Sequence, residues 1–75
     1  MAENRTESRQ DRVNVQKIKS LMALKDDKQD DLAAILGQTR STVNRKVTGK
    51  KNFLITDLVI IADHYGVKLK DLFSD

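Results

Sequence analysis

The chain has 75 residues, a formal net charge of +3 and no cysteine. This length fits one small domain with a single core, and the lack of cysteine excludes disulfides, thiolate metal sites and thiol catalysis. No apolar run is longer than that from Leu58 to Ala62, which is far shorter than the ~18 residues that a membrane-spanning helix needs. We therefore expect a small protein of a reducing cytoplasm, with no membrane segment, metal or other cofactor.

The first twelve residues are charged or polar apart from Met1 and Ala2. Such a segment buries too little apolar surface to offset the entropy of ordering it. We expect residues 1–12 to form a disordered arm and residues 13–75 to form the folded domain. The arm has no hydrophobic region, so a secretory signal is not expected. Its three arginines could follow a nucleic-acid backbone or simply keep the chain in solution: Arg5, Arg9 and Arg12.

From Val13 onwards, apolar residues recur at the three- and four-residue spacing of a helix. This pattern predicts a first amphipathic helix that ends near Leu24. Asp27 is the expected N-cap of the next helix, because a short carboxylate can accept the free N–H groups of a first helical turn. Capping explains the cluster of aspartates around Lys28 better than a calcium site, since no Gly or Glu follows at the spacing of a calcium loop.

Two short helices are predicted between Gln29 and Val47. The second helix carries the apolar residues Leu32, Ala33, Ile35 and Leu36. It ends at Gly37, the residue type that most readily takes a left-handed backbone conformation. Thr39 is the expected N-cap of the third helix, which turns Val43 and Val47 towards the core.

The rest of the chain is also predicted to be helical. After a loop at residues 48–52, a fourth helix runs from about Ile55 to Tyr65 and ends at Gly66. A short fifth helix is marked by Leu69, Leu72 and Phe73. No segment alternates with the period of a strand. The sequence therefore predicts an all-α fold, a compact bundle of four to five helices.

Charge is unevenly distributed along these helices. No acidic residue lies between Leu32 and Thr56, whereas five basic residues do: Arg40, Arg45, Lys46, Lys50 and Lys51. This separation produces a local positive potential of the kind that binds phosphate. An ordinary solvated surface can have the same composition, so charge alone leaves both interpretations open.

Three residues between Gln29 and Val47 have the spacing of a helix-turn-helix. Counted from Gln29, Ala33 is fifth, Gly37 is ninth and Val43 is fifteenth. A small fifth residue lets the next helix cross closely, a glycine at the ninth position permits the tight turn, and an apolar fifteenth residue fills the space between the helices. Each residue alone means little, but the combination predicts this motif.

With this motif the chain resembles the Cro/repressor-type helix-turn-helix family, which includes lambdoid phage repressors and many small bacterial regulators. The resemblance covers about residues 13–73, including the loop Gly49-Lys50-Lys51 and the closing segment from Leu58 to Phe73. It implies a lambda repressor-like bundle whose third helix lies in the major groove of DNA while the second crosses above the backbone. The implied function is transcription regulation by a phage or bacterial protein, with repression favoured over activation.

The resemblance also implies roles for single residues. Arg40, Ser41 and Arg45 match the base-reading positions of the family, and Asn44 lies beside them. Arginine can bind guanine through both O6 and N7, so a guanine is expected opposite Arg40 or Arg45, although either could hold only a phosphate. Gln29 matches a glutamine that binds phosphate at the start of the second helix. Six further residues are candidates for contacts to the DNA backbone: Thr39, Thr42, Lys46, Lys50, Lys51 and Asn52.

Some positions depart from the family pattern. Gln38 in the turn and Lys46 near the end of the third helix replace residues that are usually apolar. Val47, four residues after Val43 on the same face, can fill the space that Lys46 leaves. The pair Asp27-Lys28 also replaces the usual apolar and capping residues before the second helix.

The fourth helix is more apolar than one buried face requires, and Ile60 stands where the family normally has a polar residue. Ile60 could be a minor core residue or part of a surface that pairs two subunits. A twofold homodimer would place two third helices about 34 Å apart, one turn of DNA, on a palindromic operator.

Double-stranded DNA is therefore the expected partner. The alternative is a protein-interaction module, such as an antitoxin or co-regulator, that binds its partner through the apolar fourth helix. An enzyme is not expected: His64 is the only histidine, and no catalytic triad, phosphate-binding glycine loop or set of metal ligands is apparent.

Overall fold

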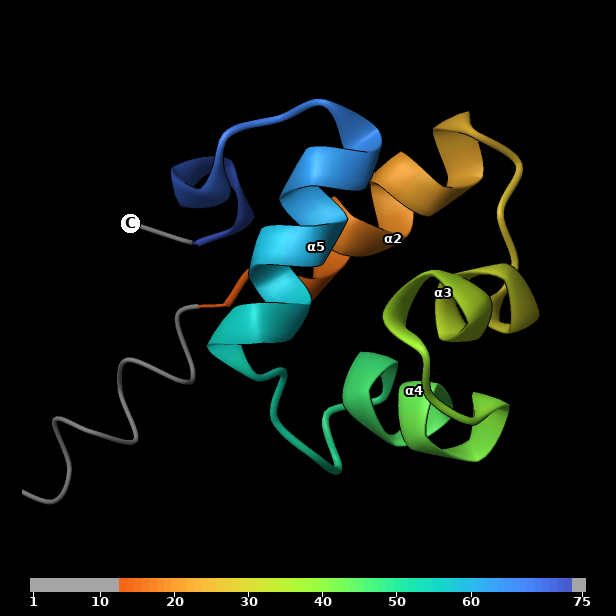
Figure 1. Ribbon diagram of the computed structural model, residues 1–75. Coiled ribbons are helices and arrows are strands. Elements are labelled where there is room, and N and C mark those ends of the chain that lie inside the picture. The colour runs from red at the N-terminus through yellow and green to blue at the C-terminus, as the bar shows by residue number, and fades with distance from the viewer. Residues whose placement is uncertain (1–12, 74–75) are drawn as a thin grey trace, which may run out of the picture.

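The computed structural model describes residues 13–73, which form a bundle of helices (Figure 1). The helical elements, in chain order, are α2 (Val15–Leu24), α3 (Gln29–Leu36), α4 (Arg40–Val47), α5 (Ile55–Tyr65) and the 3₁₀ helix η1 (Leu69–Leu72). The predicted all-α class is confirmed, and the helices begin and end close to where the sequence predicts. The predicted arm at residues 1–12 lies outside the described residues.

Local hydrogen bonds and backbone conformation determine where the helices begin and end. α2 begins after Asn14, whose side-chain oxygen accepts the backbone N–H of Lys17 at 3.1 Å. This cap satisfies an N–H group that has no partner within the helix. α3 and α5 end at Gly37 and Gly66, which take the left-handed conformation with φ of 67° and 69°. Both glycine stops are therefore confirmed.

The start of α3 corrects one prediction. The N-cap is Lys28 rather than Asp27, and the backbone N–H of Lys28 donates to the carboxylate of Asp31 at 2.8 Å. The Asp27 carboxylate instead accepts a hydrogen bond of 2.8 Å from the hydroxyl of Tyr65, at the end of α5. Asp27 thus fastens the beginning of α3 to α5, which is a tertiary role rather than a capping one.

One apolar core joins all the helices. Its most deeply buried side chains come from every element: Ile18, Leu32, Val43, Leu58, Ile61 and Leu72. The two ends of the described range meet beside it, where the backbone N–H of Asn14 donates to the carbonyl of Leu72 at 2.7 Å and Val13 forms an isolated antiparallel bridge with Phe73. η1 therefore closes the bundle against α2 and α5.

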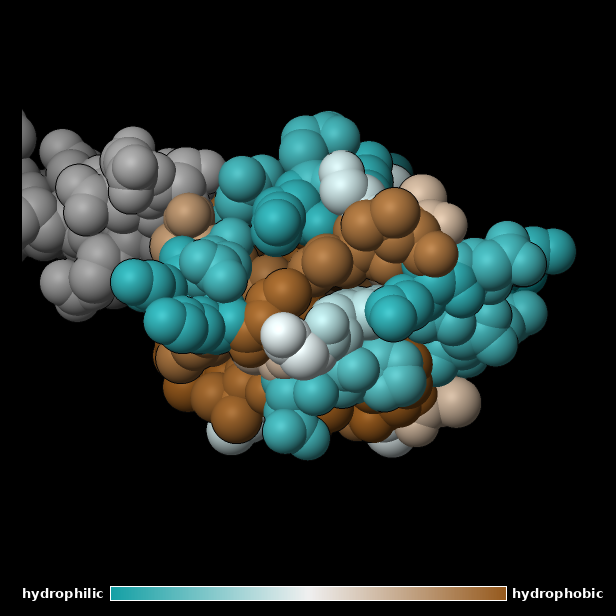
Figure 2. All heavy atoms as spheres, turned by 90° about the horizontal axis from the view of Figure 1, so that it is seen from above, coloured by the Kyte–Doolittle hydropathy of each residue, from teal (hydrophilic) through white to brown (hydrophobic). Residues whose placement is uncertain are grey.

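The apolar stretch of α5 is divided between the core and the surface. Leu58 and Ile61 are buried, whereas Val59 is 48% exposed and Ile60 is 40% exposed. Ile60 is thus a surface residue rather than a core residue. Other apolar side chains are also exposed between polar ones on the face seen from above in Figure 2. Within residues 13–73, no helix combines the length and apolar character that crossing a membrane requires.

Candidate nucleic-acid interface

α3 and α4 form a helix-turn-helix in which three residues separate the two helices. Ala33 and Val43 are both buried, and the N–H of Gln38 donates to the carbonyl of Ala33 at 2.9 Å, directly after the left-handed Gly37. The three residues that predict the motif therefore have the packing and conformation that the motif requires. α4 lies at the lower edge of the molecule in Figure 1, with no other helix outside it.

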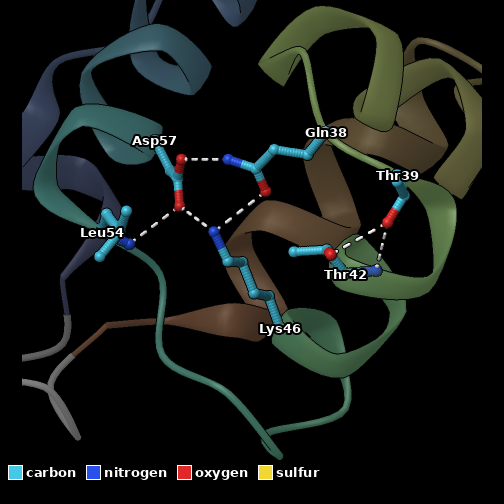
Figure 3. A network of polar contacts seen from close by, with 6 residues as sticks. All are labelled: Gln38, Thr39, Thr42, Lys46, Leu54 and Asp57. Carbon is cyan, nitrogen blue, oxygen red and sulfur yellow. Dashed lines mark hydrogen bonds and ion pairs between the residues drawn. The ribbon is translucent and has the colours of Figure 1, made fainter.

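Two threonines fix the first turn of α4. The hydroxyl oxygen of Thr39 accepts the backbone N–H of Thr42 at 3.1 Å, and the two hydroxyl groups lie 3.0 Å apart (Figure 3). Thr39 is therefore confirmed as the N-cap. The exposed hydroxyl of Thr39 lies beside the free N–H groups of the helix start, an arrangement that suits an anionic ligand such as a phosphate.

The outer face of α4 carries the predicted base-reading residues. Arg40, Ser41, Asn44 and Arg45 are all exposed, whereas the inner face of the same helix is buried. Positions four apart on a helix share a face, so these four side chains form one surface. The helix itself contains no acidic residue. Two arginines and two short polar groups are thus exposed side by side on this face.

Two contacts connect this outer face with α3. The side-chain amide of Asn44 donates to the side-chain oxygen of Gln29 at 3.1 Å. Gln29, the residue expected to bind a phosphate, therefore lies next to α4. Arg40 forms an ion pair with Asp30 at 3.5 Å, and both side chains are more than two-thirds exposed. Exposed pairs of this kind contribute little energy. A DNA phosphate or base can therefore displace Asp30 from Arg40 at small cost.

The loop after α4 brings further basic groups to its end. The backbone N–H groups of Lys50 and Lys51 donate to the carbonyl of Arg45 at 2.8 and 3.1 Å, which holds the loop against the last turn of α4. The side chains of Lys50, Lys51 and Asn52 are exposed. Among the described residues, no carboxylate forms an ion pair with Arg45, Lys50 or Lys51. The positive charge expected from the sequence is therefore present on this surface.

Lys46 is the exception, and its predicted contact to the DNA backbone is wrong. Its side chain is only 2% exposed, and its ammonium group donates to Asp57 at 2.5 Å and to the side-chain oxygen of Gln38 at 3.0 Å (Figure 3). An enclosed ammonium group with these partners cannot reach a phosphate. The sequence does indicate that Lys46 is buried, because Lys46 lies next to Val47 and three residues after Val43, on the inner face of the helix.

Asp57, in the first turn of α5, is the centre of the polar network that holds Lys46. Besides Lys46, its carboxylate accepts the amide of Gln38 at 2.7 Å and the backbone N–H of Leu54 at 2.9 Å. In the described part of the chain, every buried side-chain nitrogen or oxygen has a hydrogen-bond partner. Burial alone would raise the pKa of Asp57, but these hydrogen bonds and the charge of Lys46 hold it below its ordinary value of 3.8.

This lowered pKa predicts how stability depends on pH. Because the fold favours ionised Asp57, its contribution is complete above the unfolded-state pKa and is lost as the pH falls through the lower folded-state pKa. We expect the free energy of unfolding to decrease as the pH falls below about 5, and to decrease less in an Asp57→Asn variant. Urea unfolding at a series of pH values measures both slopes. Equal slopes would contradict this role of Asp57.

A family model described as a Cro/C1-type HTH DNA-binding domain matches residues 17–75, which include the whole helix-turn-helix. No match was found among curated proteins or solved structures. Within residues 13–73, no group of three metal-binding side chains lies close enough together to hold a metal ion.

Proposed function

Because this chain belongs to the Cro/C1-type helix-turn-helix DNA-binding domain family, we propose that it is a sequence-specific repressor that reads the major groove of duplex DNA with α4. The exposed face of α4, with two arginines and no acidic residue, carries the proposal. Repression fits a small domain, which has little surface left to recruit a polymerase. The proposal assigns no catalysed reaction to the chain, and it places its action in the bacterial cytoplasm or nucleoid.

The proposed contacts fall into two groups, according to what they touch. The base edges are assigned to the four exposed residues of α4: Arg40, Ser41, Asn44 and Arg45. Contacts to phosphates are assigned to residues at the helix starts and in the following loop: Gln29, Thr39, Thr42, Lys50, Lys51 and Asn52. The first group discriminates between sequences, whereas the second fixes the position of the protein on the duplex.

The salt dependence of binding tests the proposed interface. Each phosphate neutralised on B-DNA contributes roughly −0.9 to the slope of log affinity against log salt concentration. With Lys46 buried, the basic residues assigned to phosphates are Lys50 and Lys51, so we expect a slope of roughly −2, or of roughly −4 if Arg40 and Arg45 hold phosphates instead of bases. Fluorescence anisotropy with a labelled duplex measures the slope. No detectable binding to duplex DNA at low salt would contradict the proposed function.

We further propose a homodimer, at least on DNA, that binds a palindromic operator. Its support is Ile60, which is exposed on α5 beside the exposed Val59. Exposed apolar side chains that adjoin one another are typical of surfaces that pair with another protein. A twofold contact here would present two copies of α4 to successive turns of one face of the duplex.

A charged residue at the proposed contact tests the dimer. Ile60→Glu should weaken binding to an operator with two half-sites by about tenfold or more, because the contact would bury an unpaired carboxylate. Binding to a single half-site should be unchanged. Gel-shift titrations with both duplexes, together with sedimentation of the protein, measure these effects. Equal loss on both duplexes would show that Ile60 does not mediate pairing.

A further inference from the structure

Two of the departures from the family pattern, Gln38 and Lys46, belong to one hydrogen-bond network in this protein. Each bonds to the other and to Asp57, with distances between 2.5 and 3.0 Å (Figure 3). Gln38 lies in the turn before α4, Lys46 is the second-last residue of α4, and Asp57 lies in the first turn of α5. The network therefore connects both ends of α4 to the same point of α5.

α4 has few other contacts that could fix its direction. It has only eight residues, its buried apolar side chains are Val43 and Val47, and it packs chiefly on α3. Apolar contacts do not depend on direction, so two valines constrain the roll of a short helix less than hydrogen bonds do. Hydrogen bonds, in contrast, require defined distances and angles. Compared with apolar side chains of the same size, a buried ion pair adds little stability, but it can select one geometry.

We infer that Gln38, Lys46 and Asp57 are positioning residues for DNA recognition, which set the angle of α4 and hence its sequence preference. The inference rests on the proposed function, because it concerns how the same helix meets the bases. Lys46 directly follows Arg45, so any roll of α4 that moves the Lys46 ammonium away from Asp57 also moves the base-reading Arg45.

The linker between α4 and α5 supports this arrangement. At its beginning, the N–H groups of Lys50 and Lys51 donate to the carbonyl of Arg45, and at its end, the N–H of Leu54 donates to Asp57. Asp57 thus holds the end of the linker as well as Lys46. Hydrogen bonds thus hold both ends of the segment from Arg45 to Asp57. The buried ion pair between Lys46 and Asp57 connects these two ends directly.

A charge-neutral double variant tests the inference. Lys46→Met with Asp57→Asn removes one positive and one negative charge and keeps a side-chain oxygen that can accept the N–H of Leu54. Its binding to non-specific duplex DNA and its salt slope should match those of the wild type, because no DNA-facing residue has changed. Its ratio of operator to non-specific affinity should fall about tenfold, as expected when one bidentate arginine–guanine contact is misaligned.

The operator for this test is the site that the wild-type protein selects from random duplexes. The control for lost stability is Ile18→Val, which changes a core residue on α2. This variant should keep the wild-type ratio of operator to non-specific affinity. If the double variant does not fold, Gln38→Met replaces it, since it keeps the ion pair but removes both bonds of the amide; its ratio should fall at least about threefold. An unchanged ratio in the folded variant would overturn the inference. A wild-type protein without any sequence preference would instead overturn the proposed function.

Discussion

Replacing Arg40 and Arg45 together by glutamate should lower the affinity for duplex DNA by at least about 100-fold. Both side chains are exposed on the outer face of α4, where the proposed complex places them against base edges or phosphates. The substitution removes two favourable contacts and brings two carboxylates close to the DNA backbone. Fluorescence anisotropy at a fixed salt concentration measures the loss, and circular dichroism checks that the helices persist.

The control for this variant changes the net charge equally at another site. Lys68 and Lys70 are exposed at η1, which lies far from α4 in Figure 1, so Lys68→Glu with Lys70→Glu should reduce affinity less than tenfold. If the α4 variant kept its affinity, α4 would not be the reading helix. A protein-interaction module that uses the exposed side of α5 would then be the better interpretation.

Replacing Lys46 alone by methionine should destabilise the fold by about 3–5 kcal/mol at neutral pH. The substitution leaves the Asp57 carboxylate buried without its charged partner, with only Gln38 and the N–H of Leu54 as donors. A domain of this size has few kcal/mol to spare, so a large fraction of the variant should be unfolded. Urea unfolding followed by circular dichroism measures the change.

Two controls separate this effect from the simple loss of a lysine. Lys50→Met removes an exposed lysine and should change stability by less than about 0.5 kcal/mol. Adding Asp57→Asn to Lys46→Met should restore much of the lost stability, because no charge then remains buried alone. A cost below about 1 kcal/mol for Lys46→Met would show that Asp57 does not depend on its partner.

Local rules predict the helices of this protein well because the signals lie within a few residues of one another. Thr39 caps α4 by bonding to Thr42, three residues away, and Gly37 ends α3 through its own backbone conformation. The helix-turn-helix likewise follows from Ala33, Gly37 and Val43, whose spacing reflects how two helices cross. In each case the cause and its effect lie within about ten residues of the chain.

The polar tertiary contacts could not be predicted in the same way. Asp27 looks like a helix cap, but it bonds to Tyr65, 38 residues away, and Lys46 looks like a phosphate ligand, but it bonds to Asp57, 11 residues away. A single sequence does not say which charged residues pair once the chain is folded. The local signs of such a network were the polar residues Gln38 and Lys46 at usually apolar positions, and the place of Lys46 on the inner face of α4.

Selection of bound sites from random duplex DNA tests the central claim most directly, namely that α4 reads a sequence. The account predicts an enriched inverted repeat with guanine in each half-site and half-site centres about 10 base pairs apart. It also predicts that an Arg45→Gln variant loses the preference at one position of each half-site while other positions are kept. Recovery of the unenriched starting pool with the wild-type protein, or of the same site with the Arg45→Gln variant, would contradict it.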